Sequence, residues 1–339
     1  MAVQDQIPTG SIGSIQLCER TAAVGDAGPA VGVATVPAAI SRIAELFPDR
    51  QALRAQGRSM TYGQLDELTG KIAGRIAAAV APGAVVAVAC PDRLDQVVRL
   101  IAVWRAGAIY LALDPATPAE RAAFLLADTA VALTLTGQDD ELPSGAGPVA
   151  SCSPEQLAYL VHTSGTTGVP KAVAVAHGVL AAHVAAISHR FDLRDDDAVL
   201  HFARPMVDVA IEQVAATLAT GACLVLPPAN LLSAEEFLRL LDAEQVTVAN
   251  VAAGYFSDLV AALRTGRPVP AALRTMISGS DRLFPAAATD WHKLTGVRLL
   301  NAYGPTETVI TATVYTATGE QQDTVPIGSP VGERYAYLL

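Results

Sequence analysis

Short apolar runs alternate with amphipathic stretches along most of this 339-residue chain. The apolar runs have the length of buried strands, and the stretches between them repeat apolar residues at helical spacing. The pattern predicts helices over residues 62–80, 92–105, 118–127, 178–190, 209–219, 233–243, 252–264 and 285–294. It predicts strands over residues 85–89, 109–113, 131–135, 198–203, 222–226, 246–250, 273–278 and 297–301. Because strands separated by helices need crossover connections, we expect an α/β fold of stacked, largely parallel sheets with flanking helices.

Two segments lack this periodicity. Residues 1–30 are rich in Gly, Pro and Ala, and we expect a disordered leader or linker there. Residues 137–154 are rich in Gly, Asp and Ser and are expected to form a loop that joins two stacked sheet units. Elsewhere the helix starts are marked, because Thr61 and Gln64 have the spacing of a capping box and Asp92 suits an N-cap.

The composition narrows the functional classes. The formal net charge of −10 argues against a nucleic-acid binder, because such a protein needs a basic face. The longest uncharged run, residues 213–234, contains Gly221 and a Pro-Pro pair, so we expect no membrane span. The N-terminus has no basic-then-apolar signal pattern. The four cysteines form no CxxC pair, which favours reduced thiols in a cytoplasmic protein: Cys18, Cys90, Cys152 and Cys223.

A candidate phosphate-binding loop lies in the string YLVHTSGTTGVPK, residues 159–171. Gly165 and Gly168 let the backbone turn and bring N–H groups close to an anion, and Lys171 adds a mobile positive charge. The string is not a Walker loop, because no Gly-Lys-Ser/Thr sequence closes it. The alternative is a polar surface turn with a chance lysine. Hydroxyl donors in the string come from Thr163, Ser164, Thr166 and Thr167.

A second string, NAYGPTET over residues 301–308, follows the mostly apolar run 297–300. Together the two strings resemble the signature of the adenylate-forming enzymes, and most closely the amino-acid adenylation domains of nonribosomal peptide synthetases. The first string resembles the phosphate-binding motif of that family, and the second resembles its adenine- and metal-binding motif. Weaker matches occur in the family's order at MTYGQL (60–65), WRAGAIYLALDP (104–115) and the segment 207–227, which ends in TGACLVLP.

The resemblance implies the fold of the large N-terminal domain of such an enzyme. We assign residues 31–339 to this domain, with two similar α/β subdomains and the start of a truncated third. The family's later core motifs, which include those of a small C-terminal domain, do not follow within the sequence. We therefore expect the small C-terminal domain to be absent. We also expect this polypeptide alone to bind ATP and an amino acid but to have low adenylation activity.

The activity that the resemblance implies is activation of a carboxylate. The substrate carboxylate attacks the α-phosphorus of ATP and pyrophosphate leaves, so the protein must position two anions and neutralise the developing charge. The ATP contacts that the resemblance implies are Thr163, Ser164, Gly165, Thr166, Thr167, Gly168, Lys171, Asn301, Ala302, Tyr303, Gly304 and Thr306.

Four residues have specific implied roles. Lys171 contacts the leaving phosphates, and Thr306 donates a hydrogen bond to the α-phosphate. Glu307 binds Mg²⁺, a hard cation that prefers oxygen ligands and bridges phosphates. Tyr303 stacks on the adenine. The alternatives are a helix-start carboxylate for Glu307 and a core aromatic for Tyr303.

The amino-acid pocket follows from laying residues 207–227 on the family's fourth core motif. Asp208 then falls on the position that pairs with the substrate α-ammonium in this family, although it also suits a helix N-cap. A carboxylate in such an apolar neighbourhood is costly to desolvate, and a cationic partner offsets that cost. The same alignment places further residues around the substrate side chain: Val209, Glu212, Asn250, Met276, Ser278, Ala302, Ile310 and Thr311.

Glu212 and Asn250 are the distinguishing polar residues of this pocket. A buried carboxylate needs a cation or a strong donor. We therefore hypothesise a basic or amide-bearing substrate side chain, such as that of ornithine or a diamino acid. The alternative is that Glu212, one helical turn after Asp208, faces solvent. The segments that hold Asn250, Met276 and Ser278 are also ones in which the alignment can shift by one residue.

Several partners and functions follow from the resemblance. An adenylation domain loads its product onto the phosphopantetheine arm of a peptidyl carrier protein, and a small helper protein or a condensation domain is a further candidate partner. One alternative function is a fragment of an acyl- or aryl-CoA ligase, against which Asp208 argues. Another is a non-catalytic nucleotide-binding or interaction module.

Overall fold

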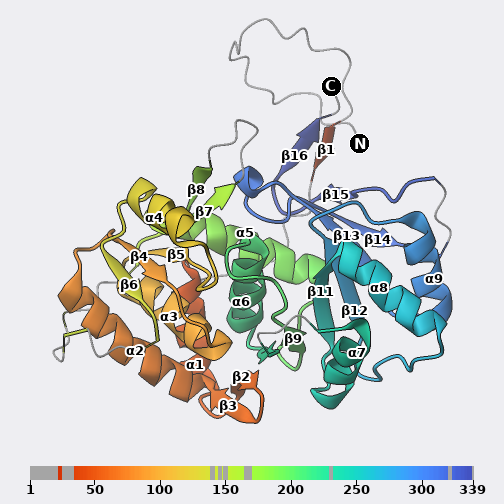
Figure 1. The fold of residues 1–339 in the computed structure, drawn as a ribbon, viewed down its shortest axis with the longest axis horizontal. Helices are drawn as coiled ribbons and strands as arrows, with labels where there is room; N and C mark the ends of the chain where they lie inside the picture. Colours follow the sequence, from red (N-terminus) through yellow and green to blue (C-terminus); the bar gives the residue numbers. More distant parts are fainter. Residues whose placement is uncertain are drawn as a thin grey trace, which may run out of the picture.

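The computed structural model describes residues 22–24, 34–137, 142–143, 147, 152–163, 170–228, 232–319 and 323–337 of the chain. Two large sheets lie on either side of helices α5 (His177–Phe191) and α6 (Asp208–Thr220), as Figure 1 shows. Strand β1 (Ala22–Val24) pairs with β16 (Tyr335–Tyr337) in a small third sheet. This part of the segment expected to be disordered is therefore a strand, because a distant partner satisfies its backbone.

The larger sheet has nine strands. In spatial order they are β15 (Ser329–Pro330), β14 (Thr313–Ala317), β13 (Arg298–Tyr303), β12 (Thr275–Gly279), β11 (Val248–Ala252), β9 (Ala198–Leu200), β10 (Cys223–Leu226), β2 (Gln51–Ala55) and β3 (Arg58–Thr61). The strands from β13 to β2 in this order all run parallel. The antiparallel strands are β3 at one edge and β14 with β15 at the other.

The smaller sheet has five strands, of which β8 is antiparallel and the others are parallel. In spatial order they are β6 (Leu133–Leu135), β4 (Val85–Val88), β5 (Ile109–Ala112), β7 (Leu157–Thr163) and β8 (Lys171–Ala176). The other helices are α1 (Val36–Leu46), α2 (Tyr62–Ala79), α3 (Arg93–Arg105), α4 (Ala119–Asp128), α7 (Ala234–Ala243), α8 (Ala253–Arg264) and α9 (Pro285–Thr295). The expected α/β fold with largely parallel sheets and flanking helices is confirmed.

Alternate side chains of the strands enter different hydrophobic clusters, as expected for sheets that are covered on both faces. Val86 and Val88 of β4 belong to the largest cluster, which joins both sheets to α1, α2, α3, α5 and α6. Ala87 of the same strand shares a cluster with Leu126 of α4 instead. On the far face of the larger sheet, α7, α8 and α9 pack around Trp291. The helical layer shared by the two sheets therefore contains α6, whose first turn carries Asp208.

The helix starts agree with their sequence signals. In α2 the backbone N–H of Gln64 donates to Thr61 Oγ1 (3.2 Å), and the N–H of Thr61 donates to Gln64 Oε1 (2.9 Å). The N–H of Asp95 donates to Asp92 Oδ1 (3.0 Å) at the start of α3. The fully buried Tyr62 then places its hydroxyl 2.8 Å from the carbonyl oxygen of Ala222, which ties α2 to the start of β10.

Several elements are absent from the sequence-based prediction: helix α1, the hairpin of β2 and β3, and the antiparallel strands β8 and β14. The hairpin turns at Gln56 and Gly57, whose φ angles of 46° and 80° suit a tight hairpin turn. Its strands are short and carry exposed polar residues, so the apolar pattern is weak there. Most of the expected loop 137–154 lies outside the described residues.

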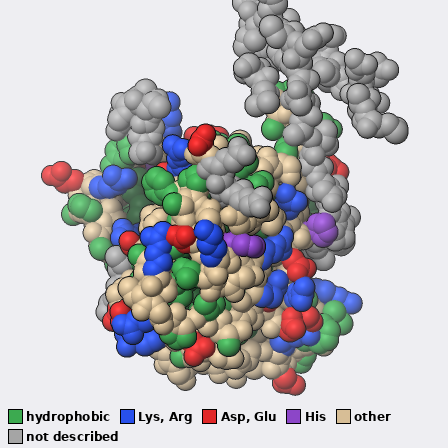
Figure 2. Space-filling view, turned by 90° about the vertical axis from the view of Figure 1, so that its right-hand side faces the viewer, with side chains coloured by type: hydrophobic (Ala, Val, Ile, Leu, Met, Phe, Trp, Pro, Cys, Tyr) green, Lys and Arg blue, Asp and Glu red, His purple; other side chains and the backbone are tan. Residues whose placement is uncertain are grey.

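The surface carries both signs of charge. Figure 2 shows the face on the side of α8 and α9, where basic and acidic side chains are interspersed. Arg264 of α8 pairs with Asp290 of α9 on these helices. Among the helices that the structure describes, none combines the length and apolar character that crossing a bilayer requires.

Candidate active site

Asp208 and Thr306, predicted from different parts of the sequence, meet in the structure. Asp208 is the first residue of α6, and Thr306 opens the short 3₁₀ helix η2 (Thr306–Thr308) that follows β13. In the structure the Thr306 side chain and the backbone N–H of Val209 lie close enough to the Asp208 carboxylate to lower its pKa by hydrogen bonding. The fourth core motif and the NAYGPTET string therefore share one site at the end of the parallel strands.

Asp208 is a buried carboxylate without a cationic partner in the described part of the chain. It is 7% exposed, and this burial raises the pKa of its carboxyl group above the ordinary value. The bond from Thr306 lowers this pKa and the nearby Glu212 charge raises it, but the net direction is upward. Val207, not Asp208, holds the N-cap position of α6, so the N-cap alternative is wrong. The ionised carboxylate is costly here, and a cationic ligand would offset that cost.

Glu212 is fully buried, which contradicts the alternative that it faces solvent. One carboxylate oxygen, Oε2, lies 2.7 Å from Nε2 of His183 on α5. The other, Oε1, accepts a hydrogen bond from the Thr311 hydroxyl (3.2 Å). On its far side, Nδ1 of His183 lies 3.1 Å from the guanidinium of Arg334. The hypothesis of a basic substrate requires a free Glu212 carboxylate, whereas both of its oxygens have partners within the chain.

The segment after the NAYGPTET string folds back tightly on it. The N–H of Ala312 donates to the carbonyl oxygen of Tyr303 (2.8 Å), and the N–H of Val309 donates to that of Thr306 (3.1 Å). Val309 and Ile310 have φ angles of 62° and 63°, which β-branched residues rarely adopt. This turn carries two predicted pocket residues, the buried Ile310 and Thr311.

The remaining residues of the string divide into exposed and buried sets. Tyr303 is 51% exposed, so it is not a core aromatic, and its ring remains available for stacking. Glu307 is also exposed. Ala302 is buried beside α6 in the largest cluster. Asn301 is buried, and its side-chain amide donates to the carbonyl oxygen of Pro326 (2.8 Å), which gives it a structural partner.

The hydroxyl-rich string connects β7 to β8. At the base of this hairpin Thr163 pairs with Lys171, whose side chain is exposed. The loop residues Ser164, Gly165, Thr166, Thr167 and Gly168 lie outside the described residues. Tyr159, the first residue of the string, is buried, and its pKa is raised by that burial and then by the charges of Asp208 and Glu212. The strand that leads into the candidate phosphate loop therefore passes close to the Asp208 site.

The three residues from uncertain segments have different surroundings. Asn250 lies on β11, and its carbonyl oxygen accepts a hydrogen bond from Gln213 of α6 (3.2 Å). The Ser278 hydroxyl is buried without a hydrogen-bond partner. Met276 packs in the cluster of α7, α8 and α9, whereas its neighbour Ile277 packs on the α6 side of the sheet. Because side chains alternate along a strand, Met276 and Ser278 share the face turned away from α6, and their places in the pocket stay predictions.

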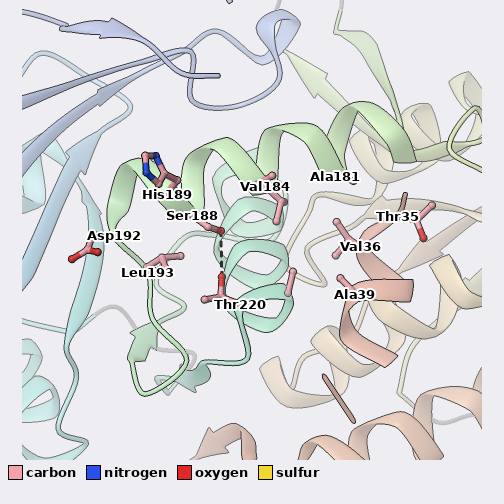
Figure 3. A pocket seen from close by; sticks show the side chains of 12 residues that line it. Thr35, Val36, Ala39, Ala181, Val184, Ser188, His189, Asp192, Leu193 and Thr220 are labelled. Atoms are coloured by element: carbon pink, nitrogen blue, oxygen red, sulfur yellow. Dashed lines mark hydrogen bonds between the residues drawn. The ribbon is translucent and has the colours of Figure 1, made fainter. Parts of the chain in front are cut away.

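A cavity of about 300 Å³ lies elsewhere, between α1, α5 and α6. Figure 3 shows Val36 and Ala39 of α1 facing Ala181 and Val184 of α5 across it, with Thr220 farther along. None of the residues that line it belongs to the predicted site.

The structure adds two residues that the sequence interpretation missed, His183 and Arg334. No motif contains them, and no spacing connects them to Glu212. His183 contacts Glu212 and Arg334 contacts His183 only because elements that are distant in the sequence pack together. A histidine within an apolar helix was the sole available signal.

Glu307 is the residue predicted to bind Mg²⁺. Among the described residues, no group of three or more His, Cys, Asp or Glu side chains could bind a metal ion by itself. Glu307 presents one exposed carboxylate, and Mg²⁺ commonly binds one or two carboxylates plus substrate phosphates. The donor set therefore fits an ion that arrives with a nucleotide.

Comparisons with known proteins show the family to which this chain belongs. The AMP-binding enzyme family matches residues 40–339. The isonitrile lipopeptide synthase of Streptomyces coeruleorubidus is 35% identical in a match that covers 92% of this chain and 24% of that protein. A crystal structure of the nonribosomal peptide synthetase FmoA3 has a TM-score of 0.80 at 25% identity and covers 91% of this chain and 35% of that one.

The fold also matches a separate N-terminal subdomain. That of Klebsiella oxytoca NpsA, in complex with anthranilyl-AMSN, has a TM-score of 0.79 at 22% identity and covers 88% of this chain and 82% of that one. The chain thus spans about a quarter of the synthase and about four fifths of the subdomain chain.

Proposed function

Because the chain belongs to the AMP-binding enzyme family, we propose that it binds ATP and an amino acid and forms the aminoacyl-adenylate with release of pyrophosphate. The observation that carries this proposal is the contact between Asp208 and Thr306. A buried carboxylate with a raised pKa suits a substrate ammonium, and it lies beside the residue expected at the α-phosphate. An acyl- or aryl-CoA ligase would have no ammonium to place there.

In this proposal each group acts by positioning or by charge. Asp208 holds the ammonium, which takes the place of the Thr306 hydroxyl on this carboxylate. The single Thr306 O–H then turns to donate to the α-phosphate that the substrate carboxylate attacks. The ring of Tyr303 stacks on adenine, and the loop after Thr163 with Lys171 holds the leaving pyrophosphate. Mg²⁺ at Glu307 would neutralise phosphate charge when bound. Asn250, on the α6 side of the sheet, favours a polar substrate side chain.

The product would be transferred to the phosphopantetheine thiol of a peptidyl carrier protein in nonribosomal peptide synthesis. We also propose that the two large sheets mark two similar α/β subdomains. Similarity to peptide synthetases and to an N-terminal subdomain supports both statements.

The test is ATP–pyrophosphate exchange, measured on the protein that contains this chain with a panel of amino acids and their deaminated analogues. We expect exchange with at least one amino acid and none with its deaminated analogue. Exchange that prefers the carboxylic acid without an amino group would favour the CoA-ligase alternative. Absence of both exchange and ATP binding at millimolar concentration would favour a non-catalytic module.

Replacing Glu307 with glutamine should raise the Mg²⁺ concentration needed for half-maximal exchange by about 10-fold or more, because an amide oxygen is a weaker ligand than a carboxylate. The KM for the amino acid should stay within about 3-fold, since Glu307 is exposed and lies outside the Asp208 contact. A Mg²⁺ titration of the exchange rate measures both effects. An unchanged Mg²⁺ dependence would remove Glu307 from the metal site.

A further inference from the structure

Four segments meet in a buried polar chain next to the candidate pocket. Its members are His183 of α5, Glu212 of α6, Thr311 after η2, and Arg334 between β15 and β16. The Glu212 and His183 side chains are 2% and 0% exposed, so solvent does not screen their contact. Burial lowers the pKa of Arg334 and the Glu212 charge raises it, so the two charges sense each other across the imidazole.

The hydrogen-bond chemistry fixes the proton positions in this chain. Arginine has donors only, so Nδ1 of His183 must accept from Arg334. The proton of a neutral imidazole then lies on Nε2, which donates to Glu212. His183 thus connects the guanidinium to the carboxylate, and the Glu212 charge is compensated without any ligand.

The polar chain of these four residues also holds the strained turn that carries predicted pocket residues. Arg334 donates to the carbonyl oxygen of Val309 (3.4 Å), and Thr311 donates to Glu212 (3.2 Å). Between these two attachments Val309 and Ile310 both have positive φ angles. Such conformations are strained in residues other than glycine and persist only where the surroundings enforce them. The polar chain therefore attaches one end of this turn to α5 and the other end to α6.

A cationic substrate side chain would have no open approach to Glu212. Both carboxylate oxygens are engaged, and a new ammonium would have to displace either His183 or Thr311. Displacing one of them would leave a buried donor unpaired and would release one end of the strained turn.

We propose that His183 and Arg334 are positioning residues that hold Glu212 as an internal clamp on the 309–311 turn. The amino acid that this site accepts therefore carries an uncharged side chain. This inference rests on the proposed function and narrows it, since it assigns Glu212 to the turn and not to a basic substrate.

The test combines substrate preference with clamp variants in the exchange assay. For the unaltered protein we expect uncharged amino acids to exceed ornithine and lysine in kcat/KM by at least about 10-fold. We expect His183→Ala and Arg334→Ala each to raise the amino-acid KM by about 10-fold or more, with the KM for ATP within about 3-fold. The double variant should be no worse than the more affected single variant, because both residues act through Glu212.

Arg190→Ala is the matched control. Arg190 is also on α5 and attaches β14 and β15 through the Val314 carbonyl oxygen and Ser329, away from the 309–311 turn. It should lower the melting temperature but leave the amino-acid KM unchanged. Glu212→Gln should keep the preference for uncharged substrates.

Two outcomes would overturn the inference. One is a preference for ornithine or lysine that Glu212→Gln removes, which would leave the proposed function intact. The other is a pair of clamp variants whose effects on the amino-acid KM add independently or equal that of Arg190→Ala. Exchange with no amino acid at all would instead reject the proposed function together with the clamp.

Discussion

Replacing Asp208 with alanine is expected to raise the KM for the amino acid by about 100-fold or more. Removing one partner of a buried ion pair costs about 3–5 kcal/mol, which corresponds to roughly 10² to several times 10³ in affinity. The KM for ATP should stay within about 3-fold, because the nucleotide contacts expected at Tyr303 and Glu307 are unaltered. Pyrophosphate exchange with each substrate varied in turn measures the two constants.

The same substitution separates the proposed function from its alternatives. A CoA-ligase fragment would show no loss that depends on the substrate amino group, and a docking module would show no exchange to lose. An amino-acid KM within about 3-fold of the original would contradict the role of Asp208. Val207→Ala is the control, since Val207 neighbours Asp208 in sequence but is 41% exposed and lies outside the predicted pocket residues.

The isosteric change Asp208→Asn should stabilise the ligand-free protein at neutral pH, although it should weaken the binding of the amino acid. The folded protein raises the pKa of Asp208, so between the ordinary and the raised pKa it binds more protons than the unfolded chain. Its free energy of unfolding therefore falls as pH rises through that window, and this loss persists at neutral pH. An uncharged asparagine side chain does not ionise, so the variant would keep this free energy of unfolding. The ligand-free variant should therefore melt at a higher temperature than the unaltered protein at pH 7 but not at pH 3. A lower melting temperature at pH 7 would contradict this assignment.

The sequence predicted an element of the fold where the signals for that element lie within one short segment. The helices α2, α3 and α9 carry their caps and apolar faces within one segment, and their limits lie within a few residues of the predicted ones. The β2–β3 hairpin belongs to the larger sheet only because Leu53 pairs with Leu224 of β10. That pairing joins distant segments, so no window of sequence contains it.

In the site, too, the residues within a motif were predictable, and the contacts between distant segments were not. The two motifs identified Asp208 and Thr306 separately, and the structure shows that the two side chains lie next to each other. Sequence alone could not show what pairs with Glu212, because His183 and Arg334 come from other elements. A lone acidic residue in a predicted pocket therefore suggested a basic substrate, whereas the packed chain supplies its own donors. The burial of Glu212 and its partners favour an uncharged substrate, and the exchange panel tests that proposal.

Replacing Gly304 with alanine is expected to remove most activity, because the 309–311 turn closes directly on this glycine. An added Cβ would lie 1.8 Å from the carbonyl oxygen of Ile310 and 2.6 Å from the backbone nitrogen of Ala312. Both are backbone atoms, so relief requires the whole turn to move. A displacement of about 1 Å in positioning groups can cost about 100-fold in rate, and overpacking costs about 1–3 kcal/mol of stability. Exchange kinetics and thermal melting measure the two losses.

Gly254→Ala provides the control for this prediction, since the two changes add the same methyl group in different surroundings. Gly254 lies in the first turn of α8, and an added Cβ there would meet no atom within 4 Å. Alanine is the better helix former, so this variant should gain up to about 1 kcal/mol and keep full activity. Because Arg334 and Glu212 hold the ends of the turn, the Gly304 variant cannot relax without losing those bonds as well. If Gly304→Ala exchanged pyrophosphate as fast as Gly254→Ala, the tight turn would not shape the amino-acid pocket.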